Sequence, residues 1–337
     1  MTQVETGAST FEVGAVKVRV VTNCAVDISA AVRAERNVVR KLVDRGLWPH
    51  ETVTLFVLDD LAPLAGHLRE RGGVMDEAAL RLPQRPMVNV YDPRHPVECF
   101  IFVNRQMMVA EGYWDDAVAT EGLLAHEHAH PLSEARATAA ARILGVEADG
   151  PEALRPLAVQ LGKTLSVGAV SELLANAFCI ANGFADELAH VDRITLDRAA
   201  ANLSQRGELE RRVRAAVAAG NLPPQNAGTL LLLADAQIGL PFALEVAPFA
   251  TTGHRTLFGE LDARLVGRVL SGMAAPLLPL YRTVQATYVA LDGNWGAAAV
   301  ESWCADILAT LSTHLSDAGA PLTLRLVSGP RTEGDDR

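Results

Sequence analysis

Hydrophobic and polar positions along the first hundred residues follow the period of β-strands. Val16–Val20 alternates apolar and charged side chains, as a half-buried strand does. Three further apolar runs predict strands at Thr52–Leu58, Met87–Tyr91 and Glu98–Asn104. The last two runs are joined by Asp92–Pro96, a segment rich in residues that break regular structure.

A helical pattern separates the first two predicted strands. Its N-cap is Asp27 or Ser29, and Gly46 ends it, because glycine readily adopts the left-handed conformation that follows a helix. Its apolar stripe consists of Val32, Val39, Leu42 and Val43.

Helical patterns dominate from Asp115 to about Ser316, interrupted by glycine and proline, and a late alternation at Leu322–Val327 predicts a final strand. The sequence therefore predicts an α+β fold. We expect an N-terminal α/β lobe over residues 1–145, a helical lobe over 146–327, and a disordered charged tail over 328–337.

Composition narrows the classes of function. The chain has 337 residues, of which 49% are hydrophobic and 21% charged, and its net charge is −10 with both signs interleaved. No polybasic groove is visible, so nucleic acid and anionic membranes are not expected partners. The start of the chain lacks the basic and apolar regions of a secretory signal, and Thr229–Ala250 is interrupted by polar residues and breakers, which argues against a membrane span.

The cysteines also bear on location. Cys24, Cys99, Cys179 and Cys304 lie far apart and form no CxxC pair, which is typical of reduced core residues. We therefore expect a soluble cytoplasmic protein, and the sequence predicts no oligomeric state.

The segment Glu121–His130 carries the clearest chemical motif, His126-Glu127-x-x-His130. Asp115 or Asp116 is a suitable N-cap for a helix through this segment. Residues four apart on a helix lie on one face, so His126 and His130 can bind one Zn²⁺ ion while Glu127 acts as the catalytic base towards a bound water.

Two other interpretations of the motif remain open. The histidines can lie on an exposed helix or form a buried network without a metal. On a strand, the period of two would place His126, His128 and His130 on one face. On a helix, His128 points about 200° away from His126 and belongs to the core or to the surroundings of the site.

Proline interrupts the predicted helix directly after the motif. Pro131 lacks the backbone donor that continues a helix, so we expect a kink or an end there, with Ser133 capping a new helix to about Leu144. Glu134 would lie about 12 Å from His126 even on a straight helix, too far to share an ion.

A third ligand is needed, and Glu172 is the predicted one. It lies in Val167–Ala181, an apolar segment where an unpaired carboxylate would cost several kcal/mol unless a cation neutralises it. Asn176, one turn later, can hydrogen-bond a ligand histidine. The alternative is an ion pair of Glu172 with a buried arginine, either Arg136 or Arg142. Further candidates for the third ligand are Asp186, Glu187 and His190.

With His126, Glu127 and His130 on one helix and Glu172 on a second, the chain resembles the gluzincin zinc metallopeptidases over residues 87–190. The resemblance implies a zincin-like fold, with a small mixed sheet and the active-site helix in one lobe and the glutamate ligand in a helical lobe. It also implies that substrate lies along an edge strand before that helix, a place that Glu98–Asn104 occupies. The family often has aspartate four residues after the glutamate, and Asn176 departs from this.

These residues predict a zinc-dependent hydrolase of a peptide or protein substrate. Zinc polarises the carbonyl, and Glu127 moves the proton of the water to the leaving amine. The oxyanion donor stays open among Tyr281, Tyr288, His254 and Arg255. Two alternatives remain, a non-haem iron(II) oxygenase using the same ligands and an inactive zincin-fold binding module.

Overall fold

The computed structural model describes residues 7–48, 50–61, 82–93, 97–273 and 277–328. Two compact units make up the chain, and each draws on separate segments of it. Unit one contains Met1–Ser133 and Phe178–Ile194, and unit two contains Glu134–Ala177 and Thr195–Arg337. Their borders differ from the division expected at residue 145, because Phe178–Ile194 returns to the first unit.

Unit one contains a five-stranded mixed sheet in the order β1-β2-β3-β5-β4. Its strands are β1 (Gly7–Val13), β2 (Val16–Thr22), β3 (Thr52–Leu58), β4 (Met87–Tyr91) and β5 (Glu98–Asn104). Strands β2, β3 and β5 run parallel, whereas β1 and β4 are antiparallel edge strands. All four strands predicted in this part of the chain are confirmed.

Strand β1 was not expected. It forms a hairpin with β2, in which Val13 pairs with Val16 and Gly14 has φ 59°. A glycine at the first central position of a two-residue loop suits the twist of a hairpin. The side chains of β1 are largely exposed, so the apolar alternation that marks the other strands is weak there.

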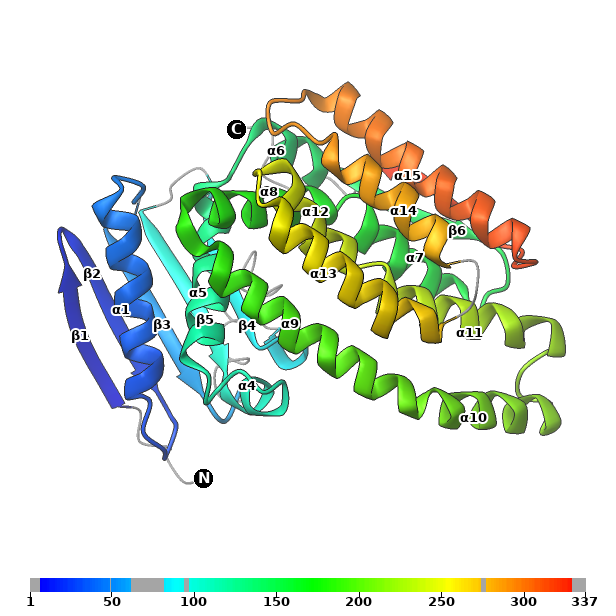
Figure 1. Cartoon of the computed structure of the whole chain (residues 1–337), viewed down its shortest axis with the longest axis horizontal. Helices are drawn as coiled ribbons and strands as arrows, with labels where there is room; N and C mark the ends of the chain where they lie inside the picture. The colour runs from blue at the N-terminus through cyan, green and yellow to red at the C-terminus, as the bar shows by residue number, and fades with distance from the viewer. Residues whose placement is uncertain (1–6, 49, 62–81, 94–96, 274–276, 329–337) are drawn as a thin grey trace. The chain divides into compact units, whose positions relative to one another are not determined.

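Helices α1 (Ser29–Asp44) and α5 (Ala117–Leu132) pack against each other, and α5 also packs on β4 (Figure 1). Helix α1 joins the parallel strands β2 and β3, and buries Ala31, Ala34, Val38, Val39 and Leu42. Its N-cap is Ile28, which has no side-chain cap bond, so the predicted caps Asp27 and Ser29 are both wrong.

The short helix α4 (Arg105–Ala110) begins directly after β5, and the end of α8 and the start of α9 complete unit one. Helices α8 (Ala169–Cys179) and α9 (Ala185–Asn202) are joined by the π-helical segment η2 (Ile180–Phe184), where Gly183 has φ 81°. Helix α9 approaches α5 at Gly122, where a Cβ atom would lie 2.8 Å from the carbonyl oxygen of Glu187.

Apolar side chains also cover the other face of the sheet. Val88 and Val90 of β4 pack with Leu58, Phe102 and Leu82, the last from the 3₁₀ turn η1 (Leu82–Gln84). Side chains alternate across a strand, so Asn89 and Tyr91 of β4 face the opposite way, towards α5.

Unit two is mostly helical, and its strands β6 (Leu144–Asp149) and β7 (Thr323–Ser328) form an antiparallel pair. Its helices, besides most of α8 and the end of α9, are α6 (Arg136–Arg142), α7 (Arg155–Leu165), α10 (Arg206–Ala218), α11 (Pro224–Gly239), α12 (Phe242–Thr251), α13 (Arg255–Arg268), α14 (Leu277–Val289) and α15 (Ala297–Asp317). Short 3₁₀ turns lie at Leu203–Gln205 and Leu270–Gly272.

The two strands of unit two differ in how well the sequence predicts them. The final strand expected at Leu322–Val327 is confirmed as β7, whereas β6 was expected to be part of a helix. Of the predicted charged tail, Ser328 ends β7, and residues 329–337 lie outside the described part of the chain.

Two corrections concern the neighbourhood of the metal motif. Helix α5 continues through Pro131 to Leu132, and Ser133 follows as its C-cap, whereas α6 begins after Ala135. Ser133 therefore caps no new helix. The predicted edge strand Glu98–Asn104 is β5, which lies between β3 and β4, so the edge strand beside α5 is β4.

Two helical segments within the described residues are long and apolar enough to cross a membrane. They are Arg155–Asn202 and Pro224–Thr251, and the second includes the stretch expected to be too interrupted. Half of the first window and 61% of the second are buried inside the structure, which is also typical of core helices in soluble proteins.

Candidate metal centre

Helix α5 begins at Asp116, one of the two predicted caps. Asp116 Oδ1 accepts hydrogen bonds from the backbone N–H groups of Val118 and Ala119, both at 3.0 Å. Its Oδ2 lies 2.7 Å from Nε2 of His190 on α9. Burial raises the pKa of Asp116, but the bonds from His190 and from the helix amides outweigh it and hold the pKa below its usual value.

His126 and His130 face each other one turn apart on α5. Their Nε2 atoms are 3.2 Å apart, and their rings lie edge to face with centroids 4.8 Å apart. Two nitrogens bound to one tetrahedral zinc at 2.0–2.1 Å are separated by about 3.3 Å. The pair therefore has the spacing that a shared zinc ion requires, and both side chains are half-buried.

Glu172 on α8 is the carboxylate that completes a possible ligand set. Among the described residues, His126, His130 and Glu172 form a group whose ligand atoms all lie within 4.8 Å of one another. Two imidazoles and one carboxylate suit zinc and leave a coordination position for water. The donors present thus fit the predicted metal.

Glu127 is held by strand β4. Its Oε2 accepts a hydrogen bond from the backbone N–H of Asn89 at 3.1 Å, and its carbonyl oxygen accepts one from the side-chain amide of Asn89. Burial raises the pKa of the buried thiols Cys99 and Cys179. The negative charges of Glu35 and Glu127 add to this at Cys99, and those of Glu127 and Glu187 add to it at Cys179.

His128 lies on the opposite side of α5 and is fully buried. Its Nε2 is 3.0 Å from Oε1 and 3.1 Å from Oε2 of Glu35 on α1, and its ring packs against Trp48. The helical interpretation of the segment is confirmed, and His128 belongs to the core as that interpretation predicts.

Two of the other candidates for a third ligand have partners elsewhere, and the third is exposed. Glu187 forms an ion pair with Lys41 at 2.6 Å, His190 binds Asp116, and Asp186 is exposed. Arg142, one of the arginines considered for Glu172, forms an ion pair with Glu134.

Three further polar residues considered from the sequence, Asn176, Tyr281 and Tyr288, have structural contacts. Asn176 donates from its side-chain amide to the carbonyl oxygen of Leu244 at 3.2 Å, a bond in the core of unit two. The hydroxyl of Tyr281 donates to Asp262, and that of Tyr288 donates to the carbonyl oxygen of Leu165. Burial raises the pKa of both tyrosines.

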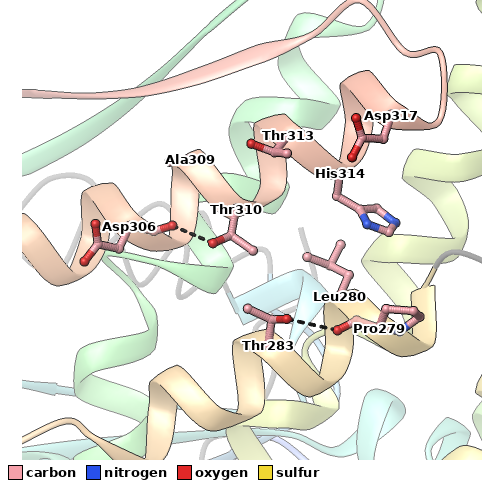
Figure 2. A pocket seen from close by; sticks show the side chains of 9 residues that line it. All are labelled: Pro279, Leu280, Thr283, Asp306, Ala309, Thr310, Thr313, His314 and Asp317. Carbon is pink, nitrogen blue, oxygen red and sulfur yellow. Dashed lines mark hydrogen bonds between the residues drawn. The ribbon is translucent and has the colours of Figure 1, made fainter.

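Unit two also has a groove of about 550 Å³ between α14 and α15, which none of the predicted site residues lines (Figure 2). The hydroxyls of Thr283 and Thr310 donate to carbonyl oxygens of their own helices. Burial lowers the pKa of His314, and Asp317 opposes this only in part. The groove thus brings together few groups that could hold a ligand.

No protein family, no curated protein and no solved structure matches this chain. Function therefore has to be argued from the geometry of the site itself.

Asn89 is the site residue that sequence reasoning missed. Two signals were present, since Asn89 is the one amide in the apolar run Met87–Tyr91, and Pro131 follows Glu127 by four residues. Neither signal reveals that the two segments are neighbours. That contact depends on β4 being the edge strand of the sheet.

Proposed function

We propose that this protein is a zinc-dependent hydrolase, a metallopeptidase that cleaves peptide or protein substrates in the cytoplasm. The observation that carries the proposal is the 3.2 Å separation between Nε2 of His126 and Nε2 of His130. Glu172 supports it as a third ligand within 4.8 Å, and the reduced state of all four cysteines agrees with a cytoplasmic location.

In this proposal, His126, His130 and Glu172 hold the metal, which when bound polarises a substrate carbonyl and activates a water molecule. Glu127 follows the first proposed ligand directly in sequence, and its carboxylate is held by the backbone N–H of Asn89. It accepts the proton of the water and passes it to the leaving amine. The N–H of Asn89 limits the orientations open to that carboxylate.

The helix and its edge strand also support a zincin-like arrangement. Among the described residues, β4 is the outer strand of the sheet and packs beside α5, so an extended peptide along it would pass the motif. In this proposal the substrate lies along Met87–Tyr91, whereas the sequence led us to expect it along Glu98–Asn104.

The same ligands also suit iron(II), because a two-histidine, one-carboxylate set with open positions is used by oxygenases. Glu127 favours hydrolysis, since an oxygenase has no need of a carboxylate base beside the ligands. An inactive zincin-fold binding module would likewise have no need of that base.

One experiment tests the proposal. Protein purified without an affinity tag is analysed for metals and assayed on a fluorescein-labelled unfolded protein, before and after removal of metal by a chelator. We expect about one equivalent of zinc, hydrolysis that disappears with the metal, and recovery when zinc is returned. Iron with oxygen consumption, or zinc with no hydrolysis, would contradict the metallopeptidase.

A further inference from the structure

The regular backbone hydrogen-bond pattern of α5 is interrupted at Glu127, the proposed catalytic base. In an α-helix, each N–H donates to the carbonyl oxygen four residues earlier, and proline has no N–H. Pro131 follows Glu127 by four residues, so the usual i+4 hydrogen bond to the carbonyl of Glu127 is absent. The pattern is restored two residues later, where Ser133 N–H donates to Ala129 O at 2.7 Å.

Asn89 supplies the missing donor from the neighbouring strand. Its side-chain amide donates to the carbonyl oxygen of Glu127, and its backbone N–H donates to the Glu127 carboxylate at 3.1 Å. One strand residue therefore holds both the main chain and the side chain of one helix residue. Asn89 is only 9% exposed, so its amide has little water available as an alternative partner.

We infer that Asn89 is the positioning residue of the base Glu127, and that Pro131 creates the dependence on it. The inference rests on the proposed function only as far as Glu127 is a base. The contacts themselves do not depend on it. Without the amide, the Glu127 carbonyl loses the hydrogen bond that Asn89 donates, and the side chain of Glu127 is held less firmly in its position.

The chemistry at position 89 is specific. Asn89→Asp keeps the shape of the side chain but replaces the donor with an oxygen that repels the Glu127 carbonyl. Asn89→Ala removes the group while leaving the backbone N–H bond to the carboxylate. Pro131→Ala gives the helix its own N–H opposite the Glu127 carbonyl, which makes the amide dispensable.

A double-mutant cycle of Asn89→Ala and Pro131→Ala tests the inference, with two readouts on the same samples. In the wild-type background, Asn89→Ala should lower the melting temperature by roughly 2–4 °C, because it removes a hydrogen bond from a part-buried carbonyl. It should lower kcat about 10–100-fold with little change in KM or zinc content, since a small displacement of the base acts on the chemical step. In the Pro131→Ala background, both losses should largely vanish.

Asn37→Ala is the matched control. Asn37 also holds α5 by its side-chain amide, donating to Glu121 Oε1 at 2.8 Å, but it does not contact Glu127. Its removal should cost stability equally with proline or alanine at position 131 and should leave kcat near that of the wild type. Asn89→Asp should behave as Asn89→Ala or worse, again rescued by Pro131→Ala.

The outcomes separate the inference from the proposed function. If Asn89→Ala lowers the melting temperature equally in the wild-type and Pro131→Ala backgrounds, Pro131 does not create a dependence on Asn89, and the inference is overturned. If Asn89→Ala and Pro131→Ala are coupled in melting temperature but not in kcat, Asn89 does not position Glu127 for catalysis. If the two substitutions are coupled in melting temperature but the wild-type protein hydrolyses nothing, the proposed function is wrong. The contacts of Asn89 with Glu127 would then have a structural role only.

Discussion

His128 and Glu35 form a fully buried pair on the side of α5 away from the metal ligands, with His128 Nε2 3.0 Å and 3.1 Å from the two carboxylate oxygens. Glu35 is on α1, so the pair joins the two helices of unit one that pack against each other. Histidines two positions apart on one helix thus have different roles, because they lie on opposite sides of it. His126 and His130 face a possible metal, while His128 holds the helix that presents them.

This pair predicts that His128→Ala damages the fold and spares the metal ligands. The variant leaves Glu35 buried without its partner, which should cost about 3–5 kcal/mol of unfolding free energy. Glu35→Gln should cost less, because the amide keeps a hydrogen bond to the ring and introduces no unpaired charge. Chemical denaturation measures the cost, and zinc analysis of the folded fraction should show occupancy like that of the wild type. Loss of zinc from well-folded His128→Ala would contradict this division.

Removal of either ligand histidine should have the opposite signature. His126→Ala and His130→Ala each leave two ligands, which hold zinc poorly, so zinc content after gel filtration should fall close to zero. His254→Ala, which removes a histidine outside the cluster, is the matched control and should keep full occupancy. Retention of one equivalent of zinc by both ligand variants would exclude this metal centre.

Glu172 can be tested as a ligand against its alternative as a partner of an arginine. As a ligand, Glu172→Gln should weaken zinc binding nearly as much as Glu172→Ala, because a neutral amide is a poor replacement for a charged carboxylate. Competition with a chromogenic chelator measures the affinity. Glu134→Gln is the control, since Glu134 pairs with Arg142 and should not affect zinc. Unchanged affinity with a large fall in melting temperature would support the ion pair.

Asp116 makes stability depend on pH in a defined direction. Its pKa is held below the usual value in the folded state, so its contribution is present above the pKa of the unfolded chain, about 3.9, and is lost as pH falls through the folded pKa. Asp116→Asn keeps an oxygen that caps α5 but removes the charge beside His190.

Because Asp116 and His190 are each about one-third exposed, the loss at neutral pH should be small, about 0.5–1 kcal/mol. Melting temperatures of the two proteins should converge as pH falls below about 4. A gap that widens towards acid would show that the charge of Asp116 does not stabilise the fold.

Local patterns in the sequence predicted most of unit one. Val16–Val20, Thr52–Leu58, Met87–Tyr91 and Glu98–Asn104 are strands because apolar alternation and β-branched residues act over a few neighbours. The order of strands could not be obtained this way. Pairing is decided by contacts between distant segments, so β5 was taken for the edge strand that β4 proves to be.

The end of a helix expected at Pro131 is found one residue later, at Leu132. Asn89, distant in sequence, donates to the Glu127 carbonyl, which lacks the i+4 bond that proline removes. That contact could not be predicted from the local sequence. Strand β6 was missed because Leu144–Asp149 pairs with β7, almost at the other end of the described chain. At β6, pairing with a distant strand overrode local propensity.

The last prediction separates a catalyst from a metal-binding scaffold, and it depends on Glu127 being a base and not a ligand. Glu127→Gln keeps the size of the side chain, and its amide oxygen can still accept the hydrogen bond from Asn89 N–H that holds the carboxylate. Zinc content and melting temperature should therefore stay near those of the wild type, whereas the proton acceptor is gone.

Loss of a general base costs about 10²–10⁴-fold in rate, and the loss should lie at the upper end if the same carboxylate delivers the proton to the leaving amine. Single-turnover hydrolysis of a labelled unfolded protein measures it, with Glu134→Gln as a carboxylate control outside the ligand set. An oxygenase would fail this assay in both forms and would consume oxygen with iron and a co-substrate. Equal hydrolysis by wild type and Glu127→Gln, with zinc bound in both, would mean that the base lies elsewhere, and the proposed mechanism would fall.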